Sequence, residues 1–313
     1  MSINRLNFTK FFNSCNYTLE DSPHIAVAVS GGPDSMALIF ILNKWINKYN
    51  GKLIGLIVNH NLRDNSYDEA KETYNLLTNL KIKSKILSVN NYKIRKKSMN
   101  EARINRFNLL TDYCKKNNIL HLFVGHHRDD NLETFINRKI AGSDFDGLKS
   151  IQHISTINNI NIIRPLLGYS KKQILKYNNE KNIPFIHDPF NMNLKYTRPT
   201  IRKFLNESST NVKSEIMTEF NAIKKYSKFY NMMIADTLNH IIKNSNRYKV
   251  ELDFNFFNNA NVLVSEKIIK KIYAYFSNKK VFIKSVKIQT LLKELKKKKF
   301  TQFNLSGMII KKR

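Results

Sequence analysis

Between residues 25 and 190 the apolar positions form two kinds of pattern in turn. Short apolar runs rich in β-branched residues are separated by longer stretches whose apolar positions recur at helical spacing. The runs lie at residues 25–30, 53–59, 85–89, 120–125 and 160–163. The first of them, IAVAVS, is almost continuously apolar, which is typical of a strand buried on both faces. The repetition of strand and helix predicts an α/β fold built on a parallel sheet.

The pattern changes after Pro189. Between residues 212 and 244 the apolar positions keep helical spacing without an intervening strand, and residues 288–295 repeat that spacing on a smaller scale. Residues 303–310 are expected to form a terminal strand. The sequence therefore predicts two parts, an α/β domain at 1–208 and a mainly helical region at 209–313.

The charge is distributed unevenly between these two parts. The chain carries 53 Lys and Arg against 24 Asp and Glu, a formal charge of +29. Residues 1–208 contribute +14, and the much shorter 209–313 contributes +15. A compositional bias toward Lys would explain a basic chain but not this concentration at one end. The basic C-terminal region is therefore predicted to bind a polyanion such as RNA.

Composition also excludes several classes of protein. No apolar stretch approaches the roughly 20 residues needed to cross a bilayer, so no membrane association is expected. The chain has 2 cysteines, Cys15 and Cys114, too far apart for a Cys-x-x-Cys metal site and too few for a disulfide framework. A cytoplasmic protein is expected, with a homodimer as an open alternative.

A glycine pair follows the first predicted strand, in the segment Ser30-Gly31-Gly32-Pro33-Asp34-Ser35. Adjacent glycines let the backbone turn tightly, and the following helix offers free N–H groups and the positive end of its dipole. The segment predicts an anion site, whereas a simple strand-to-helix turn would need one glycine. Since no Lys precedes Ser35, the loop is not of the Walker A type and suits the pyrophosphate of ATP better than γ-phosphate transfer.

Residues 30–35 resemble the PP-loop of the N-type ATP pyrophosphatases. The resemblance implies a five-stranded parallel sheet with helices on both faces, of the adenine nucleotide α-hydrolase-like kind. It also implies that the protein activates a substrate as an adenylate and releases pyrophosphate, with ATP as co-substrate and Mg2+ as cofactor. Nucleotide contacts are then expected from Ser30, Gly31, Gly32, Pro33, Asp34, Ser35 and His60.

Four further segments resemble one group in that superfamily, the tRNA(Ile)-lysidine synthases. They are VNHNLR at 58–63, EARINR at 101–106, GHHRDDNLET at 125–134, and RPLL at 164–167 with YTRPTIR at 196–202. The resemblance covers about residues 25–202. This chain departs from the usual pattern of the group at Asn61, Asn131, Phe190 and Pro199.

The third segment concentrates titratable groups at a predicted strand-to-helix junction. His126, His127, Asp129, Asp130 and Glu133 lie within eight residues, at the carboxyl end of a strand where open α/β sheets bind ligands. One interpretation is a divalent metal held by the histidines and aspartates. The other, which we favour, is a set of carboxylates that receives Mg2+ or an ammonium group.

The resemblance implies a two-step reaction on a tRNA(Ile) with a CAU anticodon. The oxygen on carbon 2 of the wobble cytidine attacks the α-phosphate of ATP, and the ε-amine of free L-lysine then displaces AMP to give lysidine. Asp34 and Asp129 are expected to hold Mg2+, and Asp130 and Glu133 the amines of lysine.

The remaining expected roles concern the lysine carboxylate, the RNA and the proton. Arg103 or Arg106 is expected to bind the carboxylate or a tRNA phosphate, and Arg198 and Arg202 also to contact substrate. His126 or His127 is expected to accept the proton that the amine must lose before it attacks. The basic C-terminal region, especially Lys293 and residues 296–299, would hold the tRNA body.

Three alternatives use the same loop. A PP-loop tRNA thiolase acts on similar RNA, but Cys15 and Cys114 supply no recognisable motif for it. An amidotransferase-type PP-loop ligase would not need a lysine-rich C-terminal region. An RNA-binding module without turnover would not need the carboxylates of residues 129–133.

Overall fold

The structure is a computed structural model that describes residues 3, 6–59, 66–88, 99–143, 145–186, 197–277, 283–297 and 299–312. Within this part the chain forms two compact units, Met1–Phe220 and Asn221–Arg313. The predicted functional division after residue 208 remains a prediction. No helix in the described ranges is long and apolar enough to span a membrane.

The first unit is built on a six-stranded sheet of order β3-β2-β1-β4-β6-β5. Its strands are β1 (His24–Val29), β2 (Lys52–Asn59), β3 (Ser84–Ser88), β4 (His121–Val124), β5 (Ile154–Ile157) and β6 (Ile160–Ile163). Every neighbouring pair is parallel except β5 and β6, which are antiparallel. The five predicted parallel strands are therefore confirmed, and β5 is an additional edge strand.

The unpredicted strand depends on a tight turn. Asn158 and Asn159, between β5 and β6, both have positive φ, 50° and 64°. Two consecutive residues with positive φ form the type of two-residue turn that matches the twist of a hairpin, and Asn tolerates this conformation better than most residues. This turn lets β5 pair with β6, so that β5 is the edge strand of the sheet.

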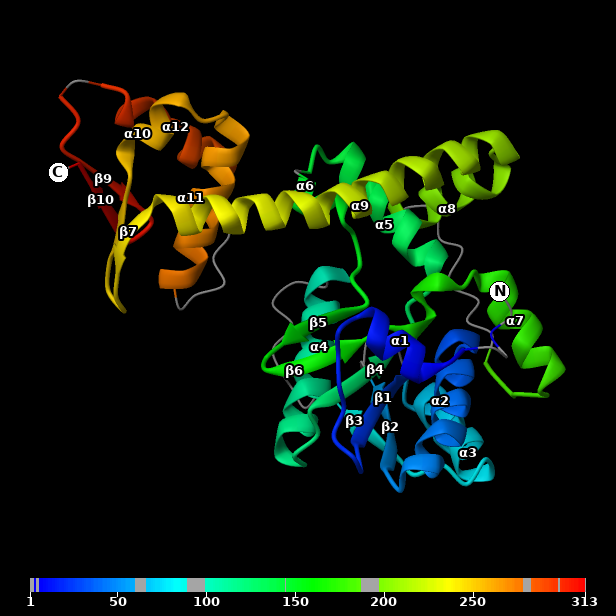
Figure 1. Cartoon of the computed structure of the whole chain (residues 1–313). Helices are drawn as coiled ribbons and strands as arrows, with labels where there is room; N and C mark the ends of the chain where they lie inside the picture. Colours follow the sequence, from blue (N-terminus) through cyan, green and yellow to red (C-terminus); the bar gives the residue numbers. More distant parts are fainter. Residues whose placement is uncertain are drawn as a thin grey trace. The chain divides into compact units, whose positions relative to one another are not determined.

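Helices cover both faces of the sheet, as predicted (Figure 1). Ile25, Val27 and Val29 of β1 pack in one core with α2 (Pro33–Ile46), α3 (Ser66–Asn79), α7 (Lys171–Glu180) and the N-terminal α1 (Phe8–Ser14). Ala26 faces the opposite core, with Phe107 and Leu110 of α4 (Met99–Lys116). Alternate residues of one strand thus enter two different cores, which is why residues 25–29 of the first apolar run are all apolar.

Further helices of this unit lie along the edge where the parallel strands end. They are α5 (Arg128–Ile140), the short α6 (Phe145–Leu148), the single turn η3 (Pro165–Gly168) and α8 (Thr197–Glu207). Another short turn, η2 (Asn47–Tyr49), leads from α2 into β2. Helix α9 (Thr210–Ile241) begins in the first unit and continues into the second.

The second unit is mainly helical, as predicted, with two added hairpins. It contains α10 (Phe254–Asn259), α11 (Val262–Phe276), α12 (Ser285–Leu295), the hairpin β7 (Ile242–Ser245) and β8 (Val250–Leu252), and the hairpin β9 (Gln302–Leu305) and β10 (Met308–Lys311). Ile268, Ile288 and Leu305 are buried in its separate core. The strand expected at residues 303–310 is the second hairpin, because Ser306 and Gly307 turn the chain with φ of 51° and 97°.

Leu38 of α2 is fully buried in the core between α2 and the sheet. Leu38→Ala should lower the free energy of unfolding of the first unit by about 3 kcal/mol, because it removes methyl groups from a packed site and leaves a cavity. Urea unfolding followed by Trp45 fluorescence measures this unit, since the chain's only Trp lies in the same core. The control Ile140→Ala, at a residue that is 72% exposed, should change the free energy by less than about 0.5 kcal/mol. Equal losses in both variants would contradict the assigned packing.

A candidate active site at the carboxyl ends of the parallel strands

Residues 30–35 connect β1 to α2 and form a candidate anion site. Gly31 has φ of +78°, and a Cβ on it would lie 2.4 Å from Thr73 Oγ1, so only glycine fits. Around Gly32, in contrast, the nearest atom to an added Cβ is Ser30 Oγ at 3.6 Å. Gly32 is the N-cap of α2, and no side chain caps that helix end. The positive end of α2 therefore faces the space beside Gly32 and is suited to a phosphate.

Ser35 braces this loop from inside. Its Oγ accepts a hydrogen bond from Ser30 N at 3.2 Å and donates one to the Gly32 carbonyl at 3.0 Å. Behind the loop, Asn178 Nδ2 of α7 donates to the Pro33 carbonyl at 2.9 Å. These bonds fix the backbone that a phosphate would meet, so that a ligand need not order it.

A cavity of about 410 Å³ lies next to the loop, at the ends of β1, β2 and β4. Its lining includes apolar side chains such as Leu56, Leu110 and Val124 together with Arg106 and His126. In the sheet, β2 and β3 lie on one side of β1, and β4 lies on the other side. The strand order therefore reverses at β1, and the cavity lies at this point. Open α/β sheets bind their ligands at this switch point.

Three aspartates surround one buried histidine beside the loop. His127 is 6% exposed, and its Nε2 lies 3.5 Å from Asp130 Oδ2 and 3.8 Å from Asp34 Oδ1. Its Nδ1 is 4.0 Å from Asp129 Oδ2. His127 precedes α5, and Asp130 Oδ2 also accepts a hydrogen bond from the His127 backbone N–H at 3.0 Å. The structure thus brings Asp34, His127, Asp129 and Asp130 together, and the roles assigned to them remain predictions.

Lys171 is the residue of this cluster that the sequence analysis missed. Its Nζ lies 2.6 Å from Asp34 Oδ2, and its backbone N–H donates to Asp129 Oδ2 at 2.8 Å. Only a segment far along the chain supplies this cation, and no local motif marked it. The one local signal is the spacing of Ser170 and Gln173, which form the capping box that sets where α7 begins.

Glu133 pairs with Arg202 of α8. Both carboxylate oxygens accept hydrogen bonds, Oε1 from Nε at 2.7 Å and Oε2 from Nη2 at 3.2 Å. The Glu133 side chain is 3% exposed and that of Arg202 43%. The hydrogen bond with Glu133 raises the pKa of Arg202 above its usual value, against the effect of burial, and the charges of Asp130 and Asp34 add to the rise. Arg202 is therefore fixed by Glu133 and close enough to Asp130 and Asp34 to interact with their charges.

The two arginines of α4 stack on one ring. The guanidinium carbons of Arg103 and Arg106 lie 5.6 and 5.5 Å from the centre of the Phe107 ring, and Arg106 lines the cavity. Arg164, at the end of β6, is 5% exposed, and burial together with the charge of Arg103 lowers its pKa to about 10. The cavity is thus flanked by positive charge on the α4 side, opposite in sign to the aspartate cluster.

Two departures from the family pattern have structural explanations. Asn131 is 1% exposed and makes two hydrogen bonds with the Ile151 backbone, donating from Nδ2 at 3.1 Å and accepting at Oδ1 at 2.7 Å. The Asn131 amide therefore supports the fold, and Asn131 is not among the residues that line the cavity. Pro199 falls in the first turn of α8, where the missing N–H would have no partner in the helix.

Some expected site residues cannot be placed. His60, Asn61 and residues 187–196, which include Phe190, lie outside the described residues. Arg198 belongs to α8, but its side chain is outside the description.

The described residues contain no group of three His, Cys, Asp or Glu that could hold a metal ion by itself. Mg2+ does not require such a group, because it is usually bound by one or two carboxylates together with substrate phosphates and water. Asp34 fits this use, since its Oδ1 is buried and accepts no hydrogen bond. The Oδ2 of Asp129 is instead occupied by the Lys171 N–H.

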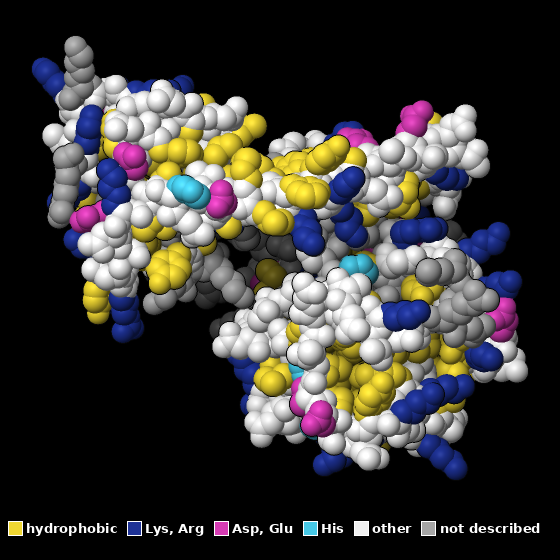
Figure 2. All heavy atoms as spheres, in the orientation of Figure 1, with side chains coloured by type: hydrophobic (Ala, Val, Ile, Leu, Met, Phe, Trp, Pro, Cys, Tyr) yellow, Lys and Arg dark blue, Asp and Glu magenta, His cyan; other side chains and the backbone are white. Residues whose placement is uncertain are grey.

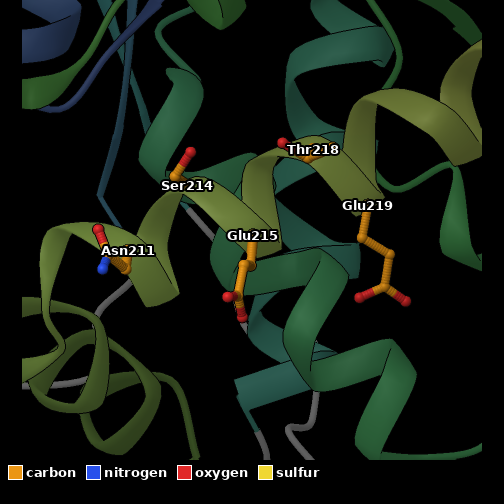
Figure 3. Close-up of a pocket in the computed structure, with 5 residues that line it drawn as sticks. All are labelled: Asn211, Ser214, Glu215, Thr218 and Glu219. Atoms are coloured by element: carbon orange, nitrogen blue, oxygen red, sulfur yellow. The ribbon is translucent and has the colours of Figure 1, made fainter.

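A second hollow, of about 510 Å³, has no comparable chemistry. It is lined by five residues of α9 alone, Asn211, Ser214, Glu215, Thr218 and Glu219 (Figure 3). Glu219 is already paired with Lys139 at 2.6 Å. Because a single helix cannot enclose a ligand, the cavity at the strand ends is the better candidate.

A mostly parallel sheet with an open phosphate loop at its switch point defines a nucleotide-binding α/β protein. Within that class, residues 2–209 match the family model of the PP-loop domain, and the chain belongs to this family.

Curated relatives of the chain include tRNA(Ile)-lysidine synthases. That of Orientia tsutsugamushi is 39% identical over 186 residues, which cover 59% of this chain and 42% of the relative. That of Wolbachia pipientis is 38% identical over 218 residues, which cover 69% of this chain and 48% of the relative. The chain therefore spans about half the length of the curated relatives it matches.

Among solved structures, the U34-tRNA thiolase of Methanococcus maripaludis with its [4Fe-4S] cluster has a TM-score of 0.55. It is 18% identical, and the match covers 66% of this chain and 73% of that one. This likeness supports the fold alone.

Arg202→Ala should lower the free energy of unfolding by about 2 to 3 kcal/mol, because it leaves the buried Glu133 carboxylate without its partner. The half-exposed position of Arg202 lets water reach the vacated side and keeps the loss below that of a fully buried pair. Lys203→Ala on the same helix is the matched control, since its pair with Glu207 is exposed and should contribute less than about 0.5 kcal/mol. Urea unfolding of both variants measures the difference, and equal effects would show that the Glu133 pair contributes no more than a surface pair.

Proposed function

We propose that the chain performs the lysidine synthase reaction, in which ATP activates carbon 2 of the wobble cytidine of tRNA(Ile) with a CAU anticodon and free L-lysine displaces AMP. The observation that supports this best is the aspartate cluster placed against the phosphate loop, in a chain that is 39% identical over 186 residues to a tRNA(Ile)-lysidine synthase. Carboxylates at that place suit a substrate that carries ammonium groups.

The nucleotide would lie along the edge formed by the strand ends. The backbone N–H groups of Gly31, Gly32, Asp34 and Ser35, at the turn into α2, would bind the pyrophosphate, and the 410 Å³ cavity beside them is lined partly by apolar groups that suit a base. Asp34 would hold Mg2+, whose charge offsets the charge that develops on the phosphate oxygens. His126 and Arg106, which also line the cavity, would contact the bound nucleotide or the cytidine.

Lysine would bind at the aspartates. Asp130 lies 3.5 Å from His127 Nε2, so an amine held by Asp130 is within reach of an imidazole that can take its proton. We propose His127 as that proton acceptor. Glu133 would have another part in this arrangement, because both of its oxygens already bind Arg202, whose charge interacts with that of Asp130. Arg103, stacked on Phe107, remains our candidate for the lysine carboxylate or a tRNA phosphate.

A tRNA thiolase is the second candidate, and its chemistry lacks support in the described residues. Cys114 is fully buried against the sheet, and burial raises the pKa of its thiol to about 12. Cys15 follows α1, and the two cysteines belong to the cores on opposite faces of the sheet. Neither is placed to act as a thiolate beside the phosphate loop.

Incorporation of labelled lysine into bulk tRNA with ATP and Mg2+ tests the proposed reaction. The chain should incorporate lysine and release equivalent AMP and pyrophosphate, and Asp130→Asn should slow incorporation at least about 100-fold, since it removes a carboxylate beside the amine and His127. Asp112→Asn, at an exposed residue of α4, is the control and should leave the rate unchanged. Turnover with sulfide or glutamine in place of lysine would overturn the proposal in favour of the alternatives.

The tRNA body would contact the second unit. Residues 221–313 contain 21 Lys and Arg against 5 Asp and Glu, and Figure 2 shows side chains of both kinds on the visible face of this unit. Lys293, Lys296 and Lys299 are exposed at and after the end of α12. Such charges bind the phosphate backbone and position the RNA.

Changing Lys293, Lys296 and Lys299 together to Gln should weaken tRNA binding and reduce the slope of log affinity against log salt by about 2, while ATP binding persists. The matched control changes Lys48, Lys81 and Lys116, exposed residues that lie before the amino ends of strands, away from the site. Filter binding over a range of salt measures both variants. Equal losses would mean that the charge acts without regard to its place.

A further inference from the structure

Lys171 places an ammonium group at the phosphate loop, which has no cation in its own sequence. The residue lies 137 positions after Asp34 in the chain, and its Nζ is 2.6 Å from Asp34 Oδ2. Asp34 is in the first turn of α2, the helix whose uncapped start faces the anion site. The lysine is thus near the place where the negative charge of a nucleotide would be greatest.

The backbone of Lys171 is fixed, and its side chain is not enclosed. The capping box of Ser170 and Gln173 and the bond from Lys171 N to Asp129 Oδ2 hold the first turn of α7. Further along α7, Asn178 bonds to the Pro33 carbonyl of the loop, so helix and loop are tied together. The Lys171 side chain is 36% exposed, which leaves its ammonium free to move between neighbouring oxygens.

The charges around the loop make a cation necessary. Asp34, Asp129 and Asp130 all lie within 4.0 Å of His127, so three carboxylates gather beside a site for a polyanion. Backbone N–H groups supply only partial charges against that repulsion. An ammonium could pair with a carboxylate when the site is empty and with a phosphate when the nucleotide is bound. Lys suits this use, since it acts as a compact point charge on a flexible stem.

We propose that Lys171 is a phosphate-binding residue of the nucleotide site, whose ammonium moves from Asp34 to an oxygen of the pyrophosphate group when the nucleotide binds. No bond is made or broken in this step, and Asp34 is left with both oxygens available. The inference rests on the nucleotide-binding part of the proposed function and not on lysine or tRNA as substrates.

Calorimetric titration of the full chain with inorganic pyrophosphate in EDTA tests the role without metal or turnover. Lys171→Met should weaken pyrophosphate binding about tenfold or more, and Lys171→Arg should restore most of it, because it keeps the charge. Lys172→Met is the matched control, since it removes the next, exposed lysine of the same helix and should have no effect.

A second pair of variants separates direct contact from an effect through Asp34. If Lys171 touches the phosphate, Lys171→Met should cause the same loss in an Asp34→Asn background, whereas a residue that only orients Asp34 should lose its effect there. Pyrophosphate affinity unchanged in Lys171→Met, or a loss that vanishes in the Asp34→Asn background, would overturn the inference. So would a wild-type chain that binds ATP with Mg2+ but shows no binding of metal-free pyrophosphate.

The result is distinguishable from a failure of the proposed function. A chain that binds pyrophosphate through Lys171 yet incorporates no lysine into tRNA would retain the inference and lose the reaction. Thermal unfolding of Lys171→Met, compared with Lys172→Met, shows whether the variant remains folded during the titrations. A variant that unfolds is replaced by Lys171→Gln, which keeps part of the side chain in place.

Discussion

The close approach of the β4 exit to the first turn of α2 is the contact on which the site depends. A Cβ on Gly125 would lie 3.1 Å from the Asp34 carbonyl carbon and from Ser35 N, so the backbone of one segment touches the backbone of the other. The residues that follow Gly125 enter α5 directly, which brings His127, Asp129 and Asp130 alongside Asp34. A side chain at position 125 would require the two backbones to move apart by a few tenths of an ångström.

An acidic cluster and a group of arginines lie on different sides of the phosphate loop at this edge of the sheet. On one side of the loop, three aspartates surround His127 and are balanced by Lys171 and Arg202. On the α4 side lie Arg103, Arg106 and the buried Arg164. A substrate with ammonium groups and a polyanionic nucleotide need surfaces of opposite sign at short range. The described side chains provide both surfaces, although no group of three His, Cys, Asp or Glu among them could hold a metal ion.

Local patterns predicted most of the fold because the strands and helices are bounded by local signals. The five parallel strands and the helices after them were confirmed, since apolar runs buried on both faces differ clearly from amphipathic stretches. The extra strand β5 was missed because it exists only through its pairing with β6 and the turn at Asn158 and Asn159. The hairpin of β9 and β10 was taken for one strand for the same reason, since Ser306 and Gly307 interrupt it by backbone conformation alone.

The sequence by itself determined the phosphate loop and the concentration of His and Asp at residues 126–130, because those groups are neighbours in the chain and need only a strand-to-helix junction. Tertiary structure decided which partner each group has. Glu133 was expected at an amine, yet its two oxygens lie on Arg202, and Asn131 bonds to the Ile151 backbone. Lys171 reaches Asp34 only because α7 packs on α2, a contact between segments 137 residues apart that no local spacing encodes.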